Sequence, residues 1–262
     1  MRETGKRKPQ SLVKVPRELI QLQQKVRIGI DIFFVNCHIF FMTYSRMICF
    51  TTVTHLINHK VVEVWAAMHK IYQMYMLRGF HIVEIAGDGE FAWIADLVSS
   101  LPTNPILNLA TASEHVGLIK RNIHTLKEKT RSIRHSLPFE RIPAVMCIRM
   151  VLHTVQFMNS FPRKGGLQHY PPNAIMNGTR LHMNQLQLKF GSYCQVAEDV
   201  TSSNILAART RGAIAMGPSG NLSRGQRFLT LDTSKLVVRN CWKELPMTSA
   251  VIDRVNMLGR TK

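Results

Sequence analysis

Two apolar runs near the start of the chain most constrain what it can fold into. Residues 26–35 and 39–50 are rich in β-branched and aromatic side chains, and only Asn36, Cys37 and His38 separate them. Runs of this kind are typical of β-strands, and a short polar segment with Asn between them is typical of a tight turn. The pattern predicts two or three antiparallel strands with a turn near Asn36.

Further along, the apolar spacing alternates between the helical and the strand period. Residues 61–77 place apolar side chains three or four positions apart, and Gly79 follows where a helix C-cap belongs. Ser113 is a plausible N-cap for a long helix over 114–135. The order of elements, three strands followed by alternating helices and strands, predicts an RNase H-like α/β fold, a mixed sheet flanked by helices. The remaining predicted elements are strands over 80–86 and 106–110 and helices over 91–98 and 142–159.

The texture of the sequence changes after residue 161. Residues 162–190 are rich in Pro, Gly and Asn, which favours a linker, with one short helix near 173–176. Short strand-like segments then recur, which predicts a small C-terminal β-rich appendage. We therefore expect a basic N-terminal tail (1–25), an RNase H-like core (26–161), a linker (162–190) and a small β-rich region (191–262). The four predicted strands of that region cover 193–197, 213–216, 226–231 and 236–239.

The net charge of the chain indicates which class of partner it binds. The formal net charge is +18, spread over most of the sequence, which favours a polyanion such as DNA or RNA over anionic lipid. A basic protein with no polyanionic partner, or a structural or ribosome-associated protein, remains an alternative. The 5 cysteines lie far apart without a CxxC pair, so we expect a reducing intracellular compartment and no zinc site. No apolar run is long enough to predict a membrane span, so we expect no membrane partner.

Two aspartates stand where chemistry is plausible. Asp31 interrupts the apolar run from Ile28 to Phe33, and a buried unpaired carboxylate would be costly there without a partner or a metal. The alternative is an exposed Asp at a sheet edge. Asp88 follows the predicted strand 80–86 within the segment Gly87-Asp88-Gly89-Glu90-Phe91, and by itself such a segment usually marks only a turn.

These residues belong to a set of motifs that resembles the integrase catalytic region of copia-type LTR retrotransposons. That family has an Asp on its first strand, a Ser-Arg after the next strand, and a segment similar to S-D-x-G-x-E-F. The order and spacing of the motifs carry the resemblance, which covers roughly residues 26–250. The matching segments are residues 30–36 (IDIFFVN), 45–46 (SR), 87–91 (GDGEF), 117–128 (GLIKRNIHTLKE), 171–178 (PPNAIMNG) and 211–247, which includes GPSGN and WKELP.

The resemblance implies a metal-dependent polynucleotidyl transferase. Enzymes of this class use three carboxylates to hold two Mg²⁺ or Mn²⁺ ions, which activate the nucleophile and stabilise the leaving oxygen. It implies that Asp31 and Asp88 are catalytic metal ligands. The third catalytic position, normally Glu, falls on Lys120, 32 residues after Asp88. An ammonium cannot ligate a metal ion, so this copy is expected to be catalytically impaired, unless Glu114 takes over as a ligand.

The resemblance also implies that the long predicted helix borders a DNA channel. Its basic side chains are candidate phosphate contacts, although a merely solvated face is the alternative reading. DNA is the expected partner, with RNA and self-association left open, and the expected location is the nucleus or a retrotransposon particle. The function is then DNA integration or, as the alternative, non-catalytic nucleic-acid binding by a decayed or host-recruited copy. The candidate nucleic-acid-binding residues are Arg121, Lys127, Lys129, Arg131 and Arg134.

Overall fold

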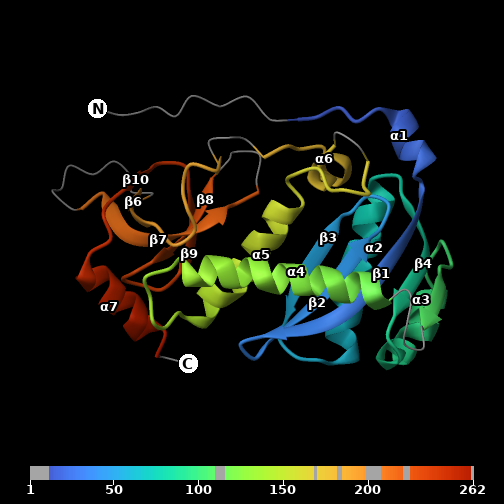
Figure 1. Ribbon diagram of the computed structural model, residues 1–262, viewed down its shortest axis with the longest axis horizontal. Helices are drawn as coiled ribbons and strands as arrows, with labels where there is room; N and C mark the ends of the chain where they lie inside the picture. The colour runs from blue at the N-terminus through green and yellow to red at the C-terminus, as the bar shows by residue number, and fades with distance from the viewer. Residues whose placement is uncertain are drawn as a thin grey trace. The chain divides into compact units, whose positions relative to one another are not determined.

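The computed structural model describes residues 12–109, 116–167, 170–181, 185–198, 208–220 and 225–260. The chain divides into two compact units. The core unit comprises residues 12–130 and 154–180, and the C-terminal unit comprises 131–153 and the described residues from Leu181 onward. Helices α4 (Val116–His135) and α5 (Ala144–Met158) each contribute residues to both units, so no single position along the chain separates them (Figure 1).

A five-stranded mixed sheet forms the centre of the core unit. Its strand order is β3-β2-β1-β4-β5, so β1 lies in the middle. The first three strands pair antiparallel, whereas β4 and β5 run parallel to β1. This is the mixed α/β sheet that the sequence predicts for an RNase H-like fold. The strands are β1 (Lys25–Val35), β2 (His38–Ser45), β3 (Thr51–Leu56), β4 (His81–Gly87) and β5 (Ile106–Leu109).

The first hairpin confirms the predicted turn but shortens the second strand. Asn36 and Cys37 both have positive φ angles, 46° and 66°, as a two-residue turn with the twist of its flanking strands requires. The second predicted run, 39–50, is not one strand. β2 ends at Ser45, whose backbone N–H donates to the carbonyl of Phe50, and Cys49 takes a φ of 57° inside the intervening turn.

Helices cover both faces of this sheet. The predicted helix 61–77 is α2 (Val61–Leu77), which buries Val64, Met68 and Ile71 in a core shared with the isoleucines of β1 and β4. Helix α4 approaches the opposite face of β1, where Gly29 leaves room for Ile119: a Cβ on Gly29 would lie 3.5 Å from the Ile119 Cβ. The shorter elements are α1 (Arg17–Leu22), the 3-10 helix η1 (Gly89–Ile94), α3 (Ala95–Ser99) and α6 (Pro172–Asn177).

The C-terminal unit has a second, antiparallel sheet, as predicted, and a helix that was not. The strand order is β10-β6-β7-β8-β9. Helix α7 (Ser249–Leu258) buries Val251 and Val255 in the same core as Met146 and Met150 of α5. The β-rich prediction missed this helix, although Val251 and Val255 lie one helical turn apart. The strands are β6 (Tyr193–Ala197), β7 (Thr210–Pro218), β8 (Gln226–Thr230), β9 (Leu236–Arg239) and β10 (Trp242–Glu244).

No helix in the described part of the chain combines the length and the apolar character that crossing a membrane requires.

Candidate functional site

Asp31 lies inside the central strand and is buried. Its side chain is 8% exposed, and its Oδ1 accepts a hydrogen bond from the backbone N–H of Ile32 at 2.8 Å. Burial raises the pKa of the Asp31 carboxyl to about 6, against the lowering effects of that hydrogen bond and of the charge on Lys120. The exposed position considered as an alternative does not apply, because Asp31 is buried and pairs with Met42 of β2.

Asp88 follows β4 directly and lies beside Asp31. Strands β1 and β4 are parallel, and Gly29 pairs with Ala86. Asp31 and Asp88 each lie two residues beyond this pair, in the same direction along the two strands. The Asp88 Oδ1 accepts from the Gly89 N–H at 2.7 Å and thereby caps η1. Gly87 is required at the strand end, since a Cβ there would lie 2.9 Å from the Cγ1 of Ile30.

Lys120 reaches the same place from α4. Its Nζ lies 3.5 Å from the Asp88 Oδ2, and its charge also acts on Asp31. The Lys120 and Asp88 side chains are 59% and 46% exposed, so this ion pair adds little to stability. The structure therefore brings together the three residues that the sequence selected as a site. Ser113 and Glu114, the predicted N-cap and the alternative ligand, lie outside the described residues.

The donor set at this site does not fit a pair of Mg²⁺ ions. Two carboxylates are present, but the third residue of the site is Lys120, whose ammonium cannot ligate a metal ion and is already paired with Asp88. Glu90 is exposed and influences Asp31 only through its charge. Within the described ranges no three His, Cys, Asp or Glu side chains gather closely enough to hold a metal ion. Asp31, Asp88 and Lys120 therefore do not form a two-metal site.

The five basic candidates on α4 do not share one face. At 100° per residue, Lys127 returns to the side of Lys120, and its Nζ lies 5.7 Å from the ring centroid of Phe33 on β1. Arg121 and Lys129 are exposed and point in other directions around the helix. Arg131 and Arg134 belong to the C-terminal unit, where Arg131 is exposed and the Arg134 guanidinium donates to the carbonyl of Glu140 at 2.7 Å.

A buried polar network that the sequence did not reveal holds α4 in place. The Asn159 side chain makes two hydrogen bonds to the backbone of Thr51, one accepted at 3.0 Å and one donated at 2.6 Å. Asn122, two residues after Lys120, donates to the Thr51 hydroxyl at 2.9 Å and accepts from Arg163 at 3.1 Å. These partners lie as many as 108 positions apart, so no local pattern could have identified them.

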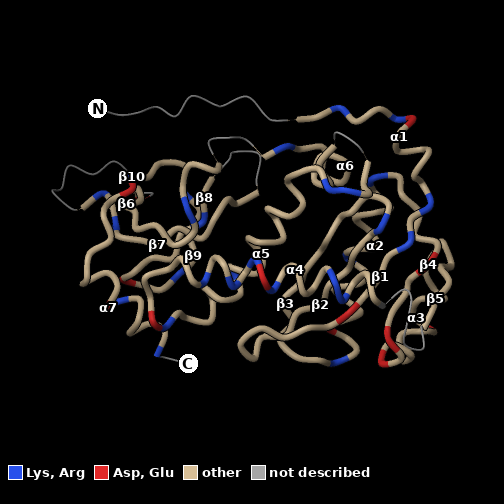
Figure 2. The backbone as a smooth tube through the Cα atoms, viewed as in Figure 1, with Lys and Arg blue, Asp and Glu red and all other residues tan. Residues whose placement is uncertain are grey.

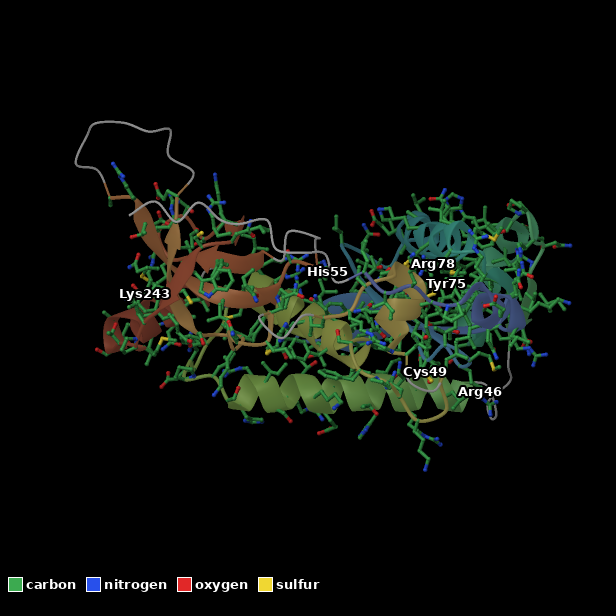
Figure 3. The ribbon with its side chains drawn as sticks, turned by 90° about the horizontal axis from the view of Figure 1, so that it is seen from above. Arg46, Cys49, His55, Tyr75, Arg78 and Lys243 are labelled. Atoms are coloured by element: carbon green, nitrogen blue, oxygen red, sulfur yellow. The ribbon has the colours of Figure 1, made fainter. Side chains whose placement is uncertain are left out.

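A pocket of about 400 Å³ opens between β1, β2, β4 and the first turns of α4. Lys25, Arg27 and Arg46 line it together with Glu84, which pairs with Arg27 at 3.1 Å. Arg46 is the basic residue of the Ser45-Arg46 motif, and Figure 3 shows it near the end of α4 where that helix begins. Basic side chains therefore line a pocket between the elements that carry Asp31, Asp88 and Lys120, although neither aspartate lines it.

Comparison with known proteins gives similarity in structure only. No protein-family model matches the chain, and no curated protein matches its sequence. Similar solved structures include the catalytic core domain of BIV integrase, at 12% identity, a TM-score of 0.43 and coverage of 58% of this chain and 93% of that one. The HTLV-2 integrase catalytic core domain, solved in complex with magnesium, is similar at 10% identity, a TM-score of 0.42 and coverage of 59% and 96%.

Proposed function

We propose that this chain is an integrase-type protein of copia-type retrotransposon origin that binds DNA but no longer catalyses strand transfer. The copia-type assignment rests on the motifs quoted above, which follow one another in the family's order between residues 26 and 250. The mixed sheet with β1 at its centre supports it, because the parallel pairing of β1 and β4 brings Asp31 and Asp88 close to each other.

One observation carries the proposed loss of catalysis. The Lys120 ammonium lies 3.5 Å from the Asp88 carboxylate, and the motif alignment assigns the family's third carboxylate to this position. A cation there opposes the binding of a divalent ion and supplies no oxygen ligand. The buried Asp31 carboxyl, whose pKa is raised to about 6, gains no compensating metal charge.

DNA binding does not require the lost carboxylate. The net charge of +18 favours a polyanion, and basic residues recur along α4 (Figure 2). On the core unit, Lys120 and Lys127 lie on one side of that helix, and Lys25, Arg27 and Arg46 line the neighbouring pocket. Binding through these groups would be independent of DNA sequence. A location in the nucleus or in a retrotransposon particle is part of the same proposal.

Two assays on the purified chain test the proposal. The first is titration of a fluorescent duplex at several salt concentrations, where we expect log K to fall linearly with log salt. Binding that ignores salt, or no binding at low salt, would contradict the DNA-binding part. The second is a strand-transfer assay on an LTR-end oligonucleotide with Mg²⁺ or Mn²⁺, where we expect no product. Product formation that Glu114→Gln abolishes would establish the active-enzyme alternative.

A further inference from the structure

The C-terminal unit contains an arginine with no partner for its charge. Arg149 lies on α5 and is half-buried, and its Nε is fully buried without a hydrogen-bond partner. Among the residues that the structure describes, none forms an ion pair with it. A partly buried guanidinium without a counter-charge is unfavourable, because its buried Nε loses water and gains no hydrogen bond in return. A bound anion would neutralise this charge.

A second arginine, Arg227, lies close enough to Arg149 for its charge to act on it. Arg227 on β8 donates from both terminal nitrogens to the carbonyls of Pro218, the last residue of β7, and of Ser219, which follows it. These acceptors are neutral, so they fix the guanidinium without cancelling its charge.

His153 ties Arg149 to the same end of β7. It follows Arg149 by one helical turn of α5, and its ring touches Gly217, where a side-chain carbon would overlap it. Gly217 has a φ of 85°, so both its backbone conformation and the close ring contact require glycine. The end of β7 is thereby held between His153 on one side and Arg227 on the other.

The electrostatics of the cluster are those of two uncompensated positive charges. Burial and the charge of Arg227 lower the pKa of Arg149 to about 10, so it stays charged at neutral pH. Burial and the charge of Arg149 lower the pKa of His153 to about 4, so the imidazole stays neutral. No described carboxylate acts on either arginine.

We propose that Arg149 and Arg227 form a binding site for a phosphate group. Two guanidinium groups at one place match the several oxygens of a phosphate, and an arginine fork can donate two parallel hydrogen bonds to them. The part of the Arg149 side chain that remains exposed would supply the donors. The phosphate can come from a DNA backbone or from a free phosphate compound, and the experiment below separates these sources. The site lies wholly within the C-terminal unit and does not depend on the aspartate site.

The test compares three full-length proteins: wild type, Arg149→Met and Arg209→Met. Methionine retains the bulk of the arginine stem but removes the charge. Arg209 is exposed in the same unit, so its variant loses the same charge without touching the cluster. Each protein is melted in inorganic phosphate and in sodium chloride of equal ionic strength. ³¹P line broadening of the phosphate signal gives a second, direct readout of binding.

We expect phosphate, but not chloride, to raise the Tm of wild type and of Arg209→Met. Arg149→Met should show no phosphate response, and its Tm without phosphate should equal or exceed that of wild type, because a repulsion is removed. If Arg149→Met does not fold, Arg149→Lys provides the test: it keeps the charge and should weaken phosphate binding about tenfold by losing the fork. An equal phosphate response in all variants would overturn the proposal.

A final arm identifies the source of the phosphate. If the site receives a DNA backbone, Arg149→Met weakens binding of a short duplex much more than Arg209→Met does. If both variants bind the duplex equally but only Arg149→Met loses the response to inorganic phosphate, the site takes a free phosphate compound. The phosphate arm keeps its meaning even if the chain binds no DNA, so failure of the proposed function is distinguishable from failure of this site.

Discussion

Replacing Lys120 by Glu should convert a site that repels divalent ions into one that binds them. A divalent ion held by the Asp88 carboxylate would stand about 4 Å from the ammonium. The repulsion is then about 2 kcal/mol at the dielectric constant of water and about 8 kcal/mol at an effective value near 20. Because Lys120 and Asp88 are each about half exposed, the lower figure applies. It corresponds to roughly 30-fold weaker binding.

The substitution Lys120→Glu removes this repulsion, adds an attraction of similar size and supplies another oxygen ligand. Together these changes amount to about 4 kcal/mol, or roughly a thousandfold in affinity. Lys120→Gln isolates the first step, because it removes the charge without adding a carboxylate. Lys129→Glu makes the same change of charge at an exposed position on another side of α4 and serves as the control.

Calorimetric titration with Mn²⁺ measures all four proteins. We expect no measurable site in wild type or in Lys129→Glu, weak binding in Lys120→Gln and the tightest binding in Lys120→Glu. If Lys129→Glu gained as much affinity as Lys120→Glu, the effect would be net charge alone. If wild type bound Mn²⁺ tightly and Lys120→Glu made no difference, the placement of the third ligand on residue 120 would be refuted.

Three further predictions concern stability, each measured by urea unfolding. The pKa of His153 is about 4 in the folded state and 6.5 in the unfolded state, so the unfolded state binds more protons below pH 6.5. The contribution of His153 to the free energy of unfolding should therefore be fully present above pH 6.5 and fall by about 2.5 kcal/mol at pH 4.5. The substitution His153→Phe should remove most of this loss. Gly87→Ala should cost about 1–3 kcal/mol, because its Cβ would crowd Ile30 at 2.9 Å, and no loss would show that the strand end can shift. Asn159→Ala should cost about 2–4 kcal/mol by leaving the Thr51 N–H and carbonyl unpaired, unless water replaces the lost amide.

The parts of the fold that could be predicted are those with local signals. The helix at 61–77 was predicted to the residue, because its apolar spacing and Gly79 define both its face and its end. The hairpin at Asn36 was predictable because the turn is short and lies between strong strand formers. Helix α7 was missed although Val251, Val255 and Leu258 recur at helical spacing, because the segments before it have the pattern of strands.

The residues of the candidate site also differ in whether the sequence could identify them. Asp31 could be selected because a carboxylate within an apolar strand is unusual at the level of sequence alone. The Asn159–Thr51 pair and the Arg149–Arg227 cluster could not, because each joins residues that only the tertiary fold brings together. In sequence, a single Asn or Arg on a predicted helix is most simply explained as a solvent-exposed residue. Only the burial seen in the structure distinguishes Asn159 and Arg149 from such residues.

The residues around Lys120 bear on the proposal that a third carboxylate was lost at this position. Asp31 remains buried at a cost to stability, since its pKa is raised to about 6 and it is mostly ionised at neutral pH. Asn122 still fixes the part of α4 that carries Lys120, through Thr51 and Arg163. A chain that had only to remain folded would gain from an uncharged residue at position 31. The proposed loss of catalysis accounts for this arrangement: a change at position 120 alone removes one ligand and leaves the buried Asp31 and the bonds that fix α4 as they were.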